Sequence, residues 1–247
     1  MTRYYVMMGN IMAAKKDSMI EKKAQIKSKK RVAERGEVFT NEREVKAMCD
    51  LVDCEIQRIE SRFLEPTCGD GNFLAEILTR KLNAVKTKYK RNHTDFELYS
   101  VVAVSSLYGV DIMKDNVTSC RERLFKIWEK IYKSVCKTEY CTETVDAVKF
   151  ILEHNILCGN ALTLKQVDEN QNDTENPIIF SEWTRPFNDY RFKRSDYIYE
   201  EMIDEGKEVS NKKKSKSAKI INNNRAFIPE EIKRNKRIVD YRKIQEA

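Results

Sequence analysis

The chain has 247 residues and a net charge of +7, with 34% charged and 41% hydrophobic residues. A chain of this length can bury the core of one α/β domain and still carry a tail or a small helical extension. The composition is typical of a soluble protein with solvated segments and argues against a membrane protein. The cysteines number 7, without a dense framework or a convincing secretory signal. They indicate reduced thiols and a cytoplasmic location.

Basic residues gather near both ends of the chain, in the runs Lys22 to Arg31, Lys212 to Lys219 and Lys233 to Arg237. Such clusters suit nucleic-acid phosphates, and they equally suit solvated or disordered tails. Charge alone leaves both interpretations open.

Two pairs of side chains could suggest zinc, Cys136 with Cys141 and His154 with Cys158. Neither pair has the C-x2-C spacing that is typical of structural zinc sites. We therefore predict no metal and interpret these side chains as buried or incidental.

The first part of the chain is rich in lysine and permits a helix up to Arg35, where GEVFT, residues 36–40, interrupts it. Apolar residues then recur at helical spacing from Glu42 to Ile59, which predicts a helix. Thr40 or Asn41 would be a suitable N-cap for this helix.

Strands and helices alternate through the middle of the chain. Strands are predicted at Phe63 to Pro66, at Leu107 to Ile112 and within Asn155 to Leu164, and helices at Asn72 to Leu82, from Val117 to Ile131 and at Thr144 to Glu153. The wide gap between the first two strands requires an inserted helix. This alternation predicts a parallel sheet. Beyond Lys165 the pattern loosens, and the apolar run Pro177 to Trp183 is the one further strand candidate.

The segment FLEPTCGDGNFLAEIL, from Phe63 to Leu78, is the most informative part of the chain. Because Gly69 and Gly71 have no Cβ, the backbone can turn sharply and let a ligand lie against main-chain N–H groups. The dinucleotide fingerprint would need a third glycine at Leu74, so NAD fits poorly. Glu65, at the strand end, could bind ammonium or hydroxyl groups. S-adenosylmethionine (SAM), an amino acid joined to a nucleoside, fits better.

Three strand-end signals stand in order along the chain: Glu65 with its glycine loop, Asp111 and Asn160. In a doubly wound sheet, all three would open onto the same carboxyl edge, where ligands bind. Each has a plain structural alternative when taken singly. Glu65 could cap a helix, Asp111 could end a strand in a turn, and Gly159 with Asn160 is an ordinary turn pair. Jointly, the three signals predict a cofactor site.

On these motifs the chain resembles the N6-adenine DNA methyltransferases of restriction-modification systems. GEVFT is similar to the motif over the SAM methionine, EPTCGDGNFL to the cofactor loop, YGVDI to the ribose segment, and GNALT to the loop at the adenine ring. The resemblance covers roughly Arg31 to Leu164. It has the order of the branch whose catalytic motif comes last.

This resemblance implies an α/β fold with a Rossmann-like class I methyltransferase sheet, mainly parallel and incomplete in this chain. It divides the chain into a basic N-terminal extension, helical or disordered (1–35), a Rossmann-like SAM-binding domain (36–203) and a basic C-terminal tail or linker (204–247). Asp111 would take both ribose hydroxyls, and Asn160, where the family more often has Asp, would face the adenine amino group. The implied cofactor-binding residues are Phe39, Thr40, Glu65, Pro66, Thr67, Cys68, Gly69, Gly71, Asn72, Phe73, Asp111, Ile112, Asn160 and Ala161.

The resemblance also implies a catalytic motif, [Asn/Asp/Ser]-Pro-Pro-[Tyr/Phe/Trp], after the third strand. The chemistry needs it because the target adenine must be flipped from the duplex, stacked on the aromatic ring and hydrogen-bonded through its amino group. The 4 prolines of this chain are never adjacent, so the motif is absent. Asn176, Pro177 and Phe180 are weak candidates, and a turn into a strand is the better interpretation of them.

Three functions are consistent with these observations. In the leading hypothesis, the chain is the SAM-binding subunit or half of a DNA adenine-N6 methyltransferase. A complementary methyltransferase or restriction subunit then supplies the catalytic motif and most of the DNA contact. In the second, it is a catalytically inactive, methyltransferase-like protein that senses SAM or binds nucleic acid. In the third, it is a self-sufficient methyltransferase for another substrate, using residues such as Asn176, Trp183 or Tyr190. No membrane partner is expected.

Overall fold

Four short parallel strands form the sheet that carries the predicted site. The computed structural model describes residues 5–7, 31, 40–137, 140–203, 219–221, 224–226, 231–232 and 237–247. The strands lie in the order β1-β2-β3-β4, with bounds β1 Tyr5–Met7, β2 Arg62–Glu65, β3 Leu107–Asp111 and β4 Ile156–Cys158. The register pairs Phe63 with Leu107 and Asp111 with Cys158. The predicted parallel arrangement is confirmed, and β1 adds a strand from within the predicted N-terminal extension.

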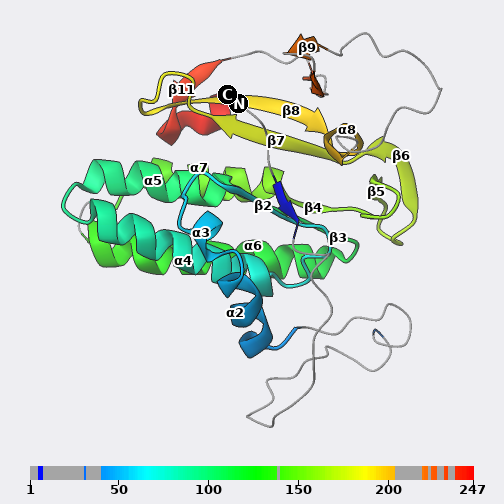
Figure 1. Cartoon of the computed structure of the whole chain (residues 1–247), viewed down its shortest axis with the longest axis horizontal. Helices are drawn as coiled ribbons and strands as arrows, with labels where there is room; N and C mark the ends of the chain where they lie inside the picture. The colour runs from blue at the N-terminus through cyan, green and yellow to red at the C-terminus, as the bar shows by residue number, and fades with distance from the viewer. Residues whose placement is uncertain are drawn as a thin grey trace.

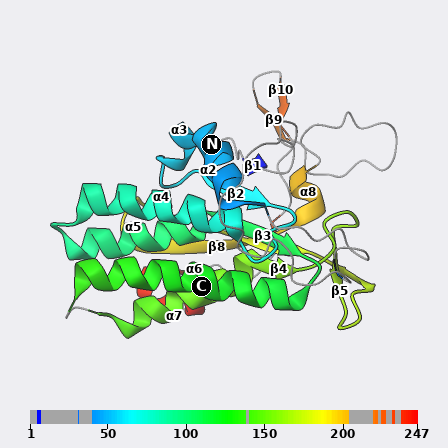
Figure 2. The same cartoon turned by 90° about the horizontal axis from the view of Figure 1, so that it is seen from below.

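Four helices cover one face of this sheet. They are α4 (Asn72–Tyr89) and α5 (His93–Ser105) between β2 and β3, and α6 (Lys114–Cys136) and α7 (Thr142–Asn155) between β3 and β4. Connections between parallel strands are almost always right-handed, so strands added in one direction place their helices on the same face. Figure 2 shows the four helices side by side. The inserted helix that the sequence requires between the first two strands is α5.

The other face of the parallel sheet is covered by a second, antiparallel sheet. Its strands are β7 (Ile179–Thr184), β8 (Arg191–Ile198) and β11 (Ile238–Asp240), in the order β11-β8-β7. Figure 1 shows β7 and β8 at the top of the view, above the parallel strands. A doubly wound sheet has helices on both faces. The expected mainly parallel architecture therefore holds for the first sheet, and the second sheet departs from it.

The strands alternate their side chains between these two layers, as period-two geometry requires. Phe63, Leu107 and Ile156 join the helices in the larger core cluster. Leu64 and Tyr108 point the other way and pack against residues of β7 and its surroundings. The full set of buried residues in that second cluster is Leu64, Tyr108, Val110, Ile178, Phe180 and Tyr199.

Lys81 ties helix α4 to the amino ends of β2 and β3. Its side chain is fully buried. The Nζ atom donates hydrogen bonds to the carbonyls of Ile59 (2.8 Å) and Ser61 (2.5 Å) and to Ser106 Oγ (2.8 Å). Burial lowers the pKa of Lys81 to about 7. The amine thus satisfies polar groups that would otherwise be buried without a donor.

Two short helices precede β2, α2 (Glu42–Asp50) and α3 (Asp53–Ile56), where the sequence predicts one. Asn41 is the N-cap of α2 as predicted, because its side chain accepts a hydrogen bond from the Arg43 backbone N–H. The single predicted helix is divided at Leu51, the C-cap of α2. Leu51 is 71% exposed and so does not add to the apolar side of the helix as the spacing predicts.

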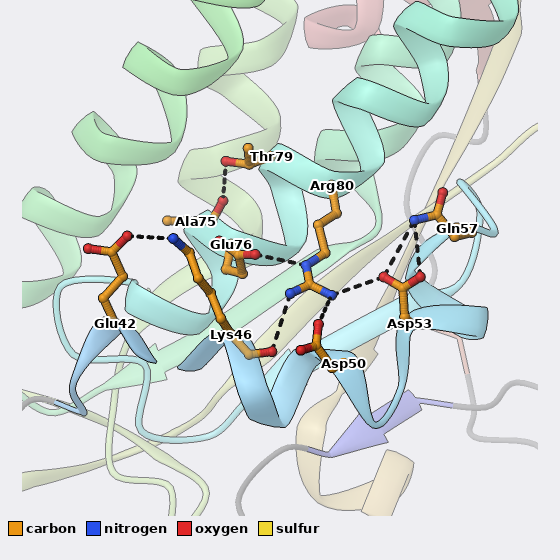
Figure 3. A network of polar contacts seen from close by, with 9 residues as sticks. All are labelled: Glu42, Lys46, Asp50, Asp53, Gln57, Ala75, Glu76, Thr79 and Arg80. Carbon is orange, nitrogen blue, oxygen red and sulfur yellow. Dashed lines mark hydrogen bonds and ion pairs between the residues drawn. The ribbon is translucent and has the colours of Figure 1, made fainter. Parts of the chain in front are cut away.

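Arg80 fastens α2 and α3 to α4. Its guanidinium forms ion pairs with Asp50 (2.7 Å), Asp53 (3.0 Å) and Glu76 (2.8 Å), and it donates to the Lys46 carbonyl at 3.2 Å. Figure 3 shows these groups converging on the one side chain. Because the helices bring three carboxylates to Arg80, the segment that leads into β2 has a fixed path.

The end of the chain is part of the folded body. After β11, the 3₁₀ helix η3 (Tyr241–Glu246) buries Tyr241 and Ile244 in the larger core cluster. Arg242 forms an ion pair of 2.9 Å with the buried carboxylate of Glu97 on α5. The predicted tail, 204–247, thus ends in an ordered segment, and the basic run 212–219 lies largely outside the described residues.

The remaining described elements are small. They are the hairpin of β5 (Lys165–Val167) and β6 (Asp173–Pro177), helix α8 (Tyr199–Ile203), and the pair β9 (Lys219–Ile221) and β10 (Asn224–Ala226). Within the described part of the chain, none of the helices has the length and apolar character needed to cross a membrane.

Candidate cofactor site at the carboxyl edge of the sheet

The glycine loop joins β2 to α4 and has the conformation that its two glycines permit. Gly69 and Gly71 have φ angles of 54° and 86°, in the left-handed region. Gly71 is the N-cap of α4 and offers no side-chain cap. A Cβ at position 71 would lie 2.6 Å from Cys120 Sγ on α6. The loop therefore needs glycine there both for its dihedral angles and for space.

Glu65 ends β2 directly before this loop, and its carboxylate is buried. The residue is 6% exposed, and Oε2 has no hydrogen-bond partner among the described residues. Burial raises the pKa of Glu65 to about 7, although a hydrogen bond from the Thr67 backbone acts against this. Buried polar groups in native proteins nearly always have a partner. The unpartnered carboxylate oxygen beside a left-handed glycine loop is therefore an acceptor to which a ligand could donate.

Asp111 ends β3 at the same edge and holds the glycine loop in place. Its Oδ2 accepts a hydrogen bond from the Gly69 backbone N–H at 3.0 Å. Its Oδ1 accepts from the Met113 N–H (2.8 Å) and from Asn116 Nδ2 (3.1 Å). A carboxylate offers about four acceptor positions. A ribose would have to share this carboxylate with the loop or replace one of its donors.

Asn160 follows β4, and both ends of its amide are engaged. Its Nδ2 donates to Asp173 Oδ1 at 2.9 Å, and its Oδ1 accepts from the Leu162 N–H at 3.0 Å. The neighbouring Ala161 packs against the smaller core cluster. These bonds use one N–H of Nδ2 and one acceptor position of Oδ1, and each atom has a second. The predicted contact of Asn160 with an adenine ring stays a prediction.

The other predicted cofactor residues differ in where they lie. Phe39 lies outside the described residues. The Cys68 thiol turns inward beneath the loop, where its hydrogen bond with Cys120 and its burial raise its pKa. Thr40 joins the loop through its carbonyl, which accepts from Asn72 Nδ2 at 3.4 Å. Of the rest, Thr67 is exposed and Pro66, Asn72, Phe73 and Ile112 are half-buried.

The weak catalytic candidates do not form a base-stacking platform. Asn176 is exposed and Pro177 ends β6. Phe180 is 1% exposed, and its ring packs edge-on against Tyr108 (5.4 Å between ring centroids) and Tyr199 (5.1 Å). The strand expected from the sequence is present as β7, but Asn176 and Pro177 lie at the end of strand β6 and not in a turn. The phenyl ring of Phe180 is part of the core between the two sheets.

Arg123 on α6 contacts the site and was not anticipated from the sequence. Its Nη1 donates to Asn72 Oδ1 at 2.7 Å and to the Asp70 carbonyl at 3.2 Å. In the sequence it is one basic residue among several on the polar side of a predicted helix. No local pattern distinguishes it, because the loop that it contacts lies far away in the chain.

The site thus brings together Thr40, the glycine loop, Glu65 and Asp111, while Asn160 is held within its own loop. A scan against protein-family models, a search of curated proteins and a search of solved structures each found no match to this chain.

Proposed function

We propose that this chain binds SAM at the carboxyl edge of β2, β3 and β4, and acts as the SAM-binding half of a DNA adenine-N6 methyltransferase. The observation that carries the proposal is the buried Glu65 carboxylate, whose Oε2 has no partner in the described chain, directly before the two left-handed glycines. Such a group needs a donor, and the open backbone of the loop offers the route by which a ligand could supply one.

The chemistry of three groups favours a ligand that is both amino acid and nucleoside. The Glu65 carboxylate can accept charge-assisted hydrogen bonds from an ammonium group. The backbone at Gly69 and Gly71 allows close approach. Asp111 is an acceptor at the end of the neighbouring strand, where a sugar with two hydroxyl groups could bind. In SAM, an α-amino group and a ribose are joined in one molecule.

Two observations support a half-enzyme rather than a complete one. The unit from β2 to β4, three parallel strands with helices on one face, is compatible with one mononucleotide-binding half of a doubly wound sheet. The chain then continues into the antiparallel sheet of β7, β8 and β11, and Phe180 is buried between the sheets. A flipped adenine needs an exposed aromatic ring and acceptors for its amino group. We propose that a partner chain supplies the exposed aromatic ring and these acceptors, together with most of the DNA contact. We also propose that the protein works in the cytoplasm, where DNA is accessible.

The first test is titration of SAM into the purified chain by calorimetry, with Glu65→Ala and Asp111→Ala as variants. The proposal expects saturable binding that both variants weaken at least about tenfold, since each loses a charged hydrogen-bond partner. Urea unfolding of each variant serves as the control that it is folded. No binding by the folded wild-type chain would refute the proposal.

The second test is transfer of a radiolabelled methyl group from SAM to unmethylated DNA. The chain is assayed alone and co-purified with the product of its neighbouring gene. Activity only in the pair, and lost with Asp111→Ala, is the expected result. Binding of SAM without transfer in either preparation would instead favour a SAM-sensing protein, which the buried Phe180 also allows.

A further inference from the structure

Helix α6 supports the glycine loop at two successive points. Gly71 packs against Cys120, as the 2.6 Å clash of an added Cβ shows. One turn further along the helix, Arg123 reaches the loop residues Asp70 and Asn72. The loop therefore depends on this helix as well as on its own sequence.

Arg123 contacts both Asp70 and Asn72 through one nitrogen atom. Its Nη1 lies 2.7 Å from Asn72 Oδ1, 3.2 Å from the Asp70 carbonyl oxygen and 3.2 Å from Asp70 Oδ1. Asn72 in turn donates to the Thr40 carbonyl at 3.4 Å. Arg123 thus connects α6 to the loop, and through Asn72 it is also connected to Thr40, which lies just before α2.

We infer that Arg123 is a positioning residue that holds the glycine loop in its cofactor-receiving shape. The inference rests on the proposed binding of SAM, which the loop would contact through its backbone. A loop that is ordered before binding loses less conformational entropy when the ligand arrives, so its support raises affinity without touching the ligand. Arginine suits this task because Nη1 belongs to a rigid, planar group and donates from one fixed position.

The same helix offers a matched control. Arg121 donates to the Ile156 carbonyl through Nε (2.9 Å) and Nη2 (2.6 Å), and to the Glu153 carbonyl at 3.0 Å. These acceptors belong to α7 and β4, on the other side of the helix from the loop. Arg121→Gln removes a comparable set of hydrogen bonds and leaves the loop contacts in place.

Two measurements on the full chain test the inference. Calorimetry with SAM should give a dissociation constant about tenfold higher for Arg123→Gln and within about twofold of wild type for Arg121→Gln. Arg123→Lys should lie between wild type and Arg123→Gln, since an ammonium keeps the charge but not the planar group. Hydrogen exchange without ligand should be faster at the backbone amides of residues 69–72 in Arg123→Gln alone.

The outcomes separate this inference from the proposed function. Wild-type affinity in Arg123→Gln, or equal weakening by Arg121→Gln, would overturn the role of Arg123 while leaving SAM binding intact. If wild type does not bind SAM, the proposed function fails, and hydrogen exchange still decides whether Arg123 orders the loop. Unchanged exchange at residues 69–72 in Arg123→Gln would overturn the inference in either case.

Discussion

Replacing Glu65 by Gln should make the protein more stable at neutral pH and less able to bind its ligand. The carboxyl group is buried, its Oε2 has no partner in the described chain, and burial raises its pKa from an ordinary 4.5 to about 7. The folded state therefore holds a proton that the unfolded state releases between these two values. Wild-type stability is fully present below the unfolded pKa and declines as the pH rises to the folded pKa.

The size of this effect follows from the shift. Each pKa unit is worth about 1.4 kcal/mol, so the interval from 4.5 to about 7 corresponds to about 3 kcal/mol. Glutamine has nearly the same shape and never ionises. We therefore expect Glu65→Gln to be more stable than wild type by about 2 to 3 kcal/mol near pH 8. Near pH 3.5, about one unit below the unfolded pKa of 4.5, most of the wild-type side chain is protonated in both states, and the difference should almost vanish.

Urea unfolding followed by tryptophan fluorescence measures this difference, because Trp128 and Trp183 are both buried. The comparison is repeated at several pH values between the two limits. A difference in unfolding free energy that does not change with pH, or a Gln variant that is less stable near pH 8, would refute the reasoning. In the same preparation, weaker binding of SAM by the more stable Gln variant would show that Glu65 lowers the stability of the folded chain and raises its affinity for the ligand.

Three further substitutions test the packing of the glycine loop and of the body that carries it. Gly71→Ala should cost about 2 to 4 kcal/mol in urea unfolding, because the backbone is left-handed and the new methyl group meets Cys120. Lys81→Met should cost about 3 kcal/mol by the same measurement, since the half-buried Ile59 and Ser61 carbonyls and the buried Ser106 hydroxyl lose their donor. An unchanged midpoint of urea unfolding would contradict this role. Arg242→Ala should cost about 1 to 2 kcal/mol, because the buried Glu97 carboxylate loses its ion pair while the half-exposed arginine is screened by solvent. Adding Glu97→Gln should recover part of the loss.

Features with a local cause could be predicted from the sequence. The left-handed turns at Gly69 and Gly71 and the N-cap at Asn41 depend on neighbouring residues, and the structure has them where predicted. The β8 strand was missed. Its apolar residues, such as Phe192 and Tyr197, face the core, while charged residues fill most of the other positions. Such a segment resembles a solvated loop until its partner strands are known.

Contacts between distant segments could not be predicted. Strand β1 pairs with β2, and β11 pairs with β8, across long stretches of chain that carry no matching local signal. The same limit applies within the site. Glu65 and Asp111 were found because each ends a strand, whereas Arg123 contacts the loop only through the packing of α6. Asn160 follows a strand end, and nothing in the local sequence predicts its hydrogen bond to Asp173.

The ion pair between Glu97 and Arg242 has a consequence for the kinetics of folding. It joins residues that are 145 positions apart, and it accompanies the burial of Tyr241 and Ile244. Bringing such distant segments together slows folding far more than it lowers stability. During synthesis, the apolar surface of α5 and α7 stays uncovered until residues 238–247 have been made. We expect the nascent chain to be most prone to aggregation, and most dependent on chaperones, in that interval.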